Sequence, residues 1–355
     1  MTISPDYSRL VARKVRAYYQ EAEDYATTRM IRAVTAGLDS SDWAAQKQGD
    51  LSKVLRVIDE RLARLDEAAP ELITRAVAEA YQAGTGAADV DMRAAGLEAV
   101  GGERASRAVD VLAEDTVRAM SGMRPRVLRE TADVYQRVTA DTASQVLTGA
   151  KTRREAARDA VRTYALDGIK PFVDESGRRW ETGAYAEMAT RTTAGKAAIA
   201  GHTDRLQALG QDLVIVSTSP ESCELCSPWE GEVLSISGDD ETGEAVASID
   251  EARDAGLQHP NCTHTVGLYL PGHTRPHEQK SDPDAYRARQ QQRAYERSIR
   301  RWKRAVEIDE QTLGKSAPES VRTRQRLRAR QDEFRQFREE HGRKNLTYRT
   351  SLTSR

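Results

Sequence analysis

Residues 213–226 read LVIVSTSPESCELC, and this stretch decides how the rest of the chain is interpreted. It begins with residues 213–216, an apolar run rich in β-branched side chains, which predicts a strand. It ends with Cys223 and Cys226, spaced as C-x2-C, which is a typical spacing for two metal ligands on one turn. A strand is thus followed closely by a candidate half of a metal site.

The sequence around this stretch predicts a small α+β module at residues 168–275. At Gly168 the helical spacing of apolar residues gives way to turn and short-strand patterns. A helix is expected over 182–209, and further strands over 233–236 and 266–270.

The preceding 1–167 segment predicts a body of long helices. The non-polar content of the chain is rich in Ala, which favours helix and fills little core volume. We expect a first helix at 6–36, a second from Ser41 or Asp42 and a third from Pro70. Helical spacing continues across 103–149, with an interruption at Pro125. A last helix is expected from the capping-box pair Thr152 and Glu155 to just before Gly168.

The 276–355 segment predicts a basic helical hairpin or tail. Helical spacing resumes after Pro283, breaks at 314–318, and resumes behind Ser316 and Glu319, which are spaced as a capping box. The apolar stripe of the hairpin is thin, so we expect it to need a partner surface; it comprises Tyr295, Ile299, Trp302, Val306 and Leu313, then Val321, Leu327, Phe334 and Phe337. The fold class expected for the whole chain is mainly α with a small α+β module.

All three cysteines fall within the central module. Residues 259–264 read HPNCTH and add His259, Cys262 and His264 to Cys223 and Cys226. Zinc favours four thiolate and imidazole ligands in a tetrahedron, so the three cysteines with His259, or with His264 as the alternative, predict a structural zinc site. The other interpretation is three reduced thiols beside a turn.

The charge is divided unevenly along the chain. Lys and Arg number 54 and Asp and Glu 55, yet residues 281–355 have a net charge of +9 and the remainder −10. The basic end is therefore a candidate for contact with nucleic-acid phosphates or with an acidic partner, and a solvated charged face is the alternative. The candidate contact residues are Arg293, Arg297, Arg300, Trp302, Lys303 and Arg304.

Several classes of protein are disfavoured. Three cysteines are too few for a disulfide framework, so we expect a reduced compartment. We expect no transmembrane helix and no signal peptide, because the chain has neither a long apolar run nor a basic and apolar start. Phosphate-binding and serine-hydrolase motifs are absent from the sequence.

Two enzyme alternatives remain for the central module. Arg191, residues 217–219 and residues 230–232 resemble ADP-ribosyltransferase elements, but the last two lie too close together to contain the strands that separate them in such folds. A toxin-like, metal-dependent nuclease is the other alternative, using His259, Cys262 and His264.

A family resemblance favours a structural role instead. The chain resembles minor capsid proteins of tailed phages, especially those of actinobacterial phages and prophages, and more distantly the Mu F-like head morphogenesis group. The matching patterns are FVDxSGRxW at 172–180, YAxMxxRT at 185–192, Gly201-His202, CxxCxxWEG at 223–231 and HPNCxH at 259–264, followed more loosely by the Arg-rich 291–304 segment. The resemblance implies a non-enzymatic virion protein, assembled in the host cytoplasm, that associates with the portal protein or the major capsid protein. It implies a role in head morphogenesis or DNA delivery, with packaged double-stranded DNA as a further candidate partner.

Overall fold

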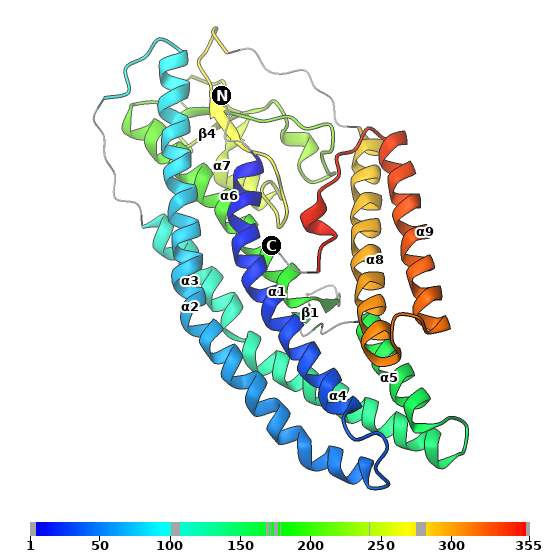
Figure 1. Ribbon diagram of the computed structural model, residues 1–355. Helices are drawn as coiled ribbons and strands as arrows, with labels where there is room; N and C mark the ends of the chain where they lie inside the picture. The colour runs from blue at the N-terminus through cyan, green and yellow to red at the C-terminus, as the bar shows by residue number, and fades with distance from the viewer. Residues whose placement is uncertain are drawn as a thin grey trace. The chain divides into compact units, whose positions relative to one another are not determined.

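A computed structural model describes most of the chain, and the described part is mainly helical with a small sheet (Figure 1). This confirms the predicted fold class. The described residues are 5–100, 107–167, 170, 172–173, 177, 179–240, 242–274 and 282–352.

The helices and strands follow the order of the chain. The helices are α1 (Pro5–Thr35), α2 (Trp43–Ala94), α3 (Ala108–Ser121), α4 (Met123–Leu147), α5 (Arg153–Asp167), α6 (Thr182–Ala208), α7 (Ile249–Asp254), α8 (Pro283–Leu313) and α9 (Pro318–Glu340). The strands are β1 (Phe172–Val173), β2 (Arg179–Trp180), β3 (Leu213–Val216), β4 (Val233–Ser235), β5 (Ala247–Ser248) and β6 (Val266–Leu268), and two short 3₁₀ turns are η1 (Ser227–Trp229) and η2 (Thr347–Arg349).

The chain forms two compact units, and each draws on separated segments. Unit 1 contains Met1–Arg16, Ala68–Ser121 and Ala186–Arg287. Unit 2 contains Ala17–Glu67, Gly122–Tyr185 and Ala288–Arg355. The predicted division into segments 1–167, 168–275 and 276–355 rests on changes in apolar periodicity along the chain, and it stays a prediction.

The helix boundaries in the N-terminal half agree with the sequence at most points. The break at Pro125 is confirmed, because α3 ends at Ser121 and Pro125 lies in the first turn of α4, where its missing N–H costs nothing. The predicted capping box at the start of α5 is also confirmed: Glu155 accepts the N–H of Thr152 at 2.9 Å. The prediction that Pro70 opens a separate helix is wrong, because α2 continues through it. Buried apolar residues on both sides of Pro70 form one stripe, and their packing outweighs the hydrogen bond that proline removes.

Unit 1 is built on a four-stranded sheet with the order β5-β4-β3-β6. The central strand β3 pairs antiparallel with β4 and β6, and β4 pairs parallel with β5. One apolar core joins this sheet to α2, α6 and α7, and its members include Met92, Ile199, Leu206, Val214, Cys226, Leu234, Ile249 and Val266. The strand predicted at 213–216 is confirmed and lies at the centre of this core.

Helices α2 and α6 approach each other closely in unit 1. A Cβ atom on Gly84 would collide with the carbonyl oxygen of Ala198, and one on Gly201 would collide with that of Tyr81. Beside this crossing, the fully buried His202 contacts the Asp91 carboxylate at 3.1 Å. The two glycines therefore allow backbone-to-backbone packing that fixes α6 beneath the sheet.

Unit 2 contains the predicted helical hairpin, with α8 and α9 side by side (Figure 1). Its apolar contacts include Tyr295, Ile299, Phe334 and Phe337, and the Tyr295 and Phe334 rings stack with centroids 5.7 Å apart. The capping box predicted at Ser316 is wrong. Pro318 occupies the first helical position of α9, so Ala317 is the N-cap and makes no side-chain cap.

Candidate metal centre

The first half of the candidate metal centre is the turn that carries Cys223 and Cys226. It follows β3 and leads directly into η1. The N–H groups of Cys226 and Ser227 donate to the carbonyl of Cys223 at 3.1 and 2.9 Å, which closes the turn. Cys226 is buried in the apolar core, and Cys223 packs against that core from its edge.

The second half is the HPNC turn at residues 259–262. The N–H of Cys262 donates to the carbonyl of His259 at 2.9 Å, and Asn261 adopts a left-handed φ of 73°. Asn tolerates this conformation better than most residues because its short side chain bonds locally. The N–H of Asn261 also donates to Thr192 Oγ1 of α6 at 3.2 Å, which ties the turn to a long helix.

The two turns present their side chains to each other. Cys223 Sγ lies 3.0 Å from His259 Nε2, and Cys226 Sγ lies 3.6 Å from Cys262 Sγ. The structure thus joins the five predicted ligand residues into one Cys/His cluster, made of two groups that share Cys226: Cys223, Cys226 and His259, and Cys226, Cys262 and His264. Donor atoms within each group lie within 4.8 Å of one another.

His264 lies just beyond the HPNC turn, at the approach to β6. Its Nδ1 is 3.4 Å from Cys262 Sγ, and its Nε2 is 2.8 Å from Glu230 Oε1. The same Glu230 oxygen accepts the backbone N–H of Ser219 at 2.6 Å. The role of Glu230 was missed in the sequence, because no local spacing rule connects position 230 to position 264.

The cluster alters the acidity of its own groups. The pKa of Cys262 is lowered to about 4, chiefly because Cys226 donates a hydrogen bond to its sulfur and His264 adds another, against the effect of burial. The same hydrogen bond and burial raise the pKa of Cys226. Burial lowers the pKa of His264, but hydrogen bonds to Cys262 and Glu230 outweigh it and the net direction is upward. The hydrogen bond between the two sulfurs therefore favours the thiolate form of Cys262 and the thiol form of Cys226.

Thiolate and imidazole donors at these separations match the chemistry of zinc. The sequence predicted which residues would meet; metal binding itself stays a prediction.

The predicted basic contact residues of α8 divide into two sets. Arg300 and Arg304 are buried in unit 2, which differs from the surface contact predicted for them. Arg304 reaches Glu181 at 3.0 Å and Glu23 at 3.2 Å, and Arg300 donates to the carbonyl of Arg349 at 2.7 Å. The remaining predicted residues are partly or fully exposed: Arg293, Arg297, Trp302 and Lys303.

The cause of this division is helical spacing. Positions 300 and 304 continue the face of α8 that contains the buried residues Gln292 and Glu296, and that face meets carboxylates from distant segments. Sequence alone gives the spacing but not the buried carboxylates.

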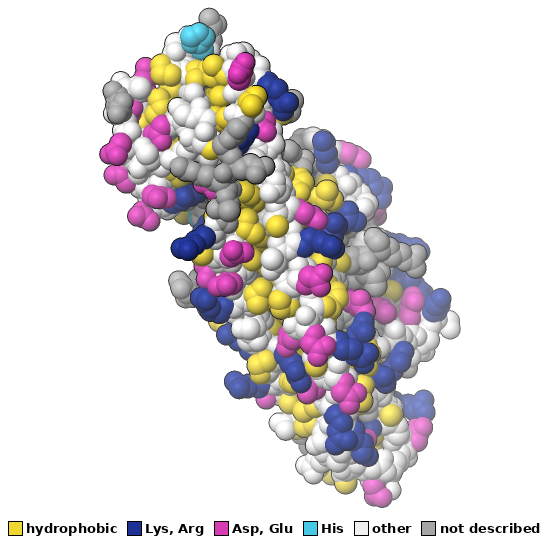
Figure 2. Space-filling view, turned by 90° about the vertical axis from the view of Figure 1, so that its left-hand side faces the viewer, with side chains coloured by type: hydrophobic (Ala, Val, Ile, Leu, Met, Phe, Trp, Pro, Cys, Tyr) yellow, Lys and Arg dark blue, Asp and Glu magenta, His cyan; other side chains and the backbone are white. Residues whose placement is uncertain are grey.

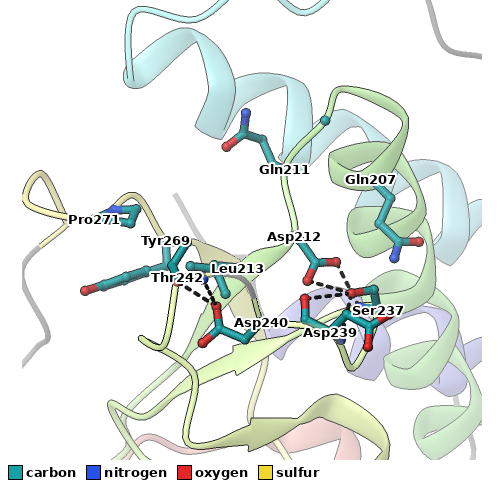
Figure 3. A pocket seen from close by; sticks show the side chains of 11 residues that line it. Gln207, Gln211, Asp212, Leu213, Ser237, Asp239, Asp240, Thr242, Tyr269 and Pro271 are labelled. Carbon is teal, nitrogen blue, oxygen red and sulfur yellow. Dashed lines mark hydrogen bonds between the residues drawn. The ribbon is translucent and has the colours of Figure 1, made fainter.

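A separate hollow of about 620 Å³ lies in unit 1, near the start of β3 (Figure 3). It is lined by acidic side chains, but these hold the neighbouring loop together. Asp212 accepts hydrogen bonds from the N–H and hydroxyl of Ser237 at 2.8 and 2.9 Å. Asp240 accepts from Thr242 and Ala245, and these bonds lower its pKa to about 2. The carboxylates therefore stabilise the loop that borders the hollow.

Charges of both signs are interspersed on the face shown in Figure 2, with hydrophobic side chains between them. That face shows no large area of one sign. Among the described residues, no helix is both long and apolar enough to cross a membrane.

Comparison with known proteins places the chain among phage structural proteins. A family described as "Phage minor capsid protein 2" matches residues 3–339. A protein named "Structural protein" from Lactococcus phage LL-H is 26% identical over 187 residues, a match that covers 50% of each chain. The chain thus spans about half the length of that curated relative, and no solved structure matches. The predicted resemblance is confirmed, and the virion is where proteins of this family are found: the chain belongs to the phage minor capsid protein 2 family.

Proposed function

We propose that this structural virion protein docks at the portal or on the inner capsid surface, and acts in head morphogenesis or DNA delivery without catalysing a reaction. Its family implies assembly with other head proteins. The finer assignment is supported by the surface of the α8–α9 hairpin.

That surface carries arginines without carboxylate partners. Arg322, Arg326 and Arg328 of α9 are exposed, and no ion pair is found for them among the described residues. Arg326 lies over the Trp302 ring, with its guanidinium carbon 5.6 Å from the ring centroid, and Arg330 lies 5.7 Å over Tyr295. Arginine and aromatic side chains held together in this way suit a flat, negatively charged partner.

The exposed arginines of α9, with Arg322 and Arg326 on one side, Arg328 on another and Trp302 beside Arg326, are called the hairpin surface, and they are the observation that carries the proposal. A basic surface within the +9 segment 281–355, on a chain whose remainder has a net charge of −10, would orient the molecule toward DNA phosphates or toward an acidic patch on a head protein.

The enzyme alternative has one supporting feature. Cys262, His264 and Glu230 have the order of a nucleophile, a base and an orienting carboxylate, with separations of 3.4 and 2.8 Å. However, the Cys262 sulfur also contacts Cys226 and accepts the N–H of His264 at 3.3 Å, so it is committed to neighbours inside the module. Glu230 is equally engaged, which argues against a transferase role for residues 230–232.

The test uses surface substitutions in the phage genome. Removing the entire hairpin would strip Arg304 from the buried Glu23 and from the half-buried Glu181, and so destabilise unit 2. We therefore choose the triple variant Arg322→Gln, Arg326→Gln and Arg328→Gln. The matched control neutralises three arginines that are 73–75% exposed and paired with carboxylates, namely Arg118, Arg154 and Arg287.

We expect the triple variant to lower the copy number per head, the DNA filling or the infectivity, and the control variant to leave all three unchanged. Fewer copies per head would indicate docking on a head protein, and normal copies with poor DNA filling or delivery would indicate contact with DNA. Normal copy number, filling and infectivity in the triple variant would contradict the proposal. DNA cleavage by purified protein that disappears in Cys262→Ser would replace it with the enzyme alternative.

A further inference from the structure

We propose that the Cys/His cluster of unit 1 binds one zinc ion with a structural role, through its three thiolates and Nε2 of His259. In this assignment His264 is a positioning residue. It is held by Glu230 and hydrogen-bonds to the sulfur of Cys262.

The donor separations support a single tetrahedral ion. Around zinc, ligand atoms lie about 3.5–3.8 Å apart, given zinc–sulfur bonds near 2.3 Å and zinc–nitrogen bonds near 2.0 Å. The sulfur–sulfur distance from Cys226 to Cys262 is 3.6 Å, which falls in this range. The sulfur–nitrogen distance from Cys223 to His259 is 3.0 Å, so these two atoms would move apart by about 0.5 Å to bind the same ion. Thiolates also favour zinc over the hard cations magnesium and calcium, which take oxygen ligands.

The choice of His259 rests on the correspondence of the two turns. Each turn has two intervening residues and is closed by an N–H bond from its last residue to the carbonyl of its first. First positions face each other, Cys223 with His259, and last positions face each other, Cys226 with Cys262. Two such turns supply two ligands each. The two groups whose donor atoms lie within 4.8 Å of one another share only Cys226, so the two pairs would close on one ion to form a four-ligand cage.

The tautomer of His259 suits this role. Its Nδ1 lies 2.8 Å from the carbonyl oxygen of Pro260, and a carbonyl can only accept, so Nδ1 carries the proton. Nε2 is then left with a lone pair directed at the cluster. Metal-binding histidines are commonly oriented in this way by a backbone carbonyl.

His264 is placed to support the cage from outside. Its Nε2 is engaged with Glu230, which also accepts the N–H of Ser219 at the exit of β3. Its backbone N–H and its Nδ1 both approach the Cys262 sulfur, at 3.3 and 3.4 Å. These contacts fix the side chain of Cys262 and disperse charge on its thiolate.

The ion would close the loop between two turns that are 36 residues apart in the chain. With four protein ligands no coordination position is open, which is the arrangement of structural rather than catalytic zinc. The first turn follows β3 and the second precedes β6, which pairs with β3, so the ion would hold the end of β3 to the approach of β6.

The experiment uses the full-length chain, purified without chelator and equilibrated with zinc, then freed of excess metal. Elemental analysis should give about one zinc per chain. Cobalt substituted for zinc should show sulfur-to-metal charge-transfer absorption, a reading that does not depend on any variant folding. The variants are His259→Gln, His264→Gln and Cys226→Ser, and the exposed His273→Gln is the control.

We expect Cys226→Ser and His259→Gln to lose the ion in chelator competition. His264→Gln should keep one ion per chain with affinity reduced about 10- to 100-fold, as for loss of a hydrogen-bond partner of a ligand. Wild-type protein with less than about 0.2 zinc per chain and no charge-transfer band would overturn the site, since a bound ion needs sulfur–metal bonds. Loss of the ion in His264→Gln but not in His259→Gln would overturn the ligand assignment.

Discussion

Gly84 and Gly201 show how a single hydrogen atom in place of a side chain sets the packing of unit 1. Both lie where α2 and α6 cross, and a methyl group at either position would meet backbone oxygen. Because backbone cannot swing aside as a side chain can, we expect Gly84→Ala to lower the free energy of unfolding by about 1–3 kcal/mol or more.

The matched control is Gly86→Ala, two residues along the same helix. Its Cβ would have nothing within 4 Å, so the substitution should stabilise by about 0.5–1 kcal/mol through helix propensity alone. Urea unfolding measures the free energy of unfolding of both variants, which should fall for Gly84→Ala and rise for Gly86→Ala. Equal changes at the two sites would refute the close crossing of the helices.

Glu23 links the stability of unit 2 to pH. Burial raises its pKa to about 8 despite the nearby Arg304, and its Oε2 has no hydrogen-bond partner among the described residues. The unfolded chain releases this proton near the ordinary value of 4.5, whereas the folded chain keeps it to about 8. Between pH 5 and pH 8 the folded state therefore holds more protons, and its stability should fall as pH rises, by at most about 1.4 kcal/mol per pH unit from this group.

Glu181 does not cancel this trend. Burial opposes its ionisation, but Arg304 and Arg300 outweigh burial and lower its pKa to about 2, so its contribution changes only below about pH 4.5. Burial also raises the pKa of the neighbouring Asp24 to about 6, so Glu23→Gln should flatten the pH dependence of urea unfolding between pH 6 and 8 and leave the slope from Asp24 below pH 6. The exposed Glu21→Gln on the same helix should leave the slope as in the wild type.

At the scale of elements, α8 and α9 are joined by a buried polar contact as well as by their aromatic cluster. Thr323 Oγ1 donates to the fully buried Asp309 carboxylate at 2.6 Å. Thr323→Val keeps the shape of the side chain but removes the hydroxyl donor. We expect the free energy of unfolding to fall by about 1–3 kcal/mol, because the buried Asp309 carboxylate loses a hydrogen bond. Val321→Ala, at an exposed position on the same helix, should change stability by less than about 0.5 kcal/mol in the same thermal or urea measurement.

Sequence patterns predicted the elements where local chemistry determines them. The strand at 213–216, the break near Pro125 and the end of α5 before Gly168 follow from β-branched runs, proline geometry and capping residues. Helix α7 and strand β5 were missed, because they are too short to show a period, although Ser248 and Glu251 form a capping box that marks the helix. The continuity of α2 through Pro70 was missed because it depends on packing along the whole stripe.

The candidate site, too, was predicted only as far as local spacing determines it. Spacing alone predicted that Cys223, Cys226, His259 and Cys262 would converge, since turns with two intervening residues present both ends in one direction. Glu230 and the buried Glu23 could not be predicted, because their partners lie far away in the sequence and only the folded chain brings them together.

For the whole molecule, the salt dependence of binding distinguishes contact with DNA phosphates from apolar docking on a protein. If the hairpin surface binds phosphates, the affinity of the full-length chain for double-stranded DNA should fall steeply with salt, with a log–log slope of about −0.9 for each phosphate contacted. The triple variant at Arg322, Arg326 and Arg328 should lose about 0.9 of that slope for each contact removed. Fluorescence anisotropy at several salt concentrations measures it, and an unchanged slope in the triple variant would exclude phosphate contact by this surface.

The interleaving of the two units has a consequence for synthesis on the ribosome. Unit 1 needs residues from near the start of the chain, from its middle and from as far as Arg287, and unit 2 draws on segments reaching beyond that point. We therefore expect neither unit to be complete until late in translation, and a prematurely terminated chain to lack a finished unit. Only a chain translated past both sets of segments would then offer both folded units to a growing head.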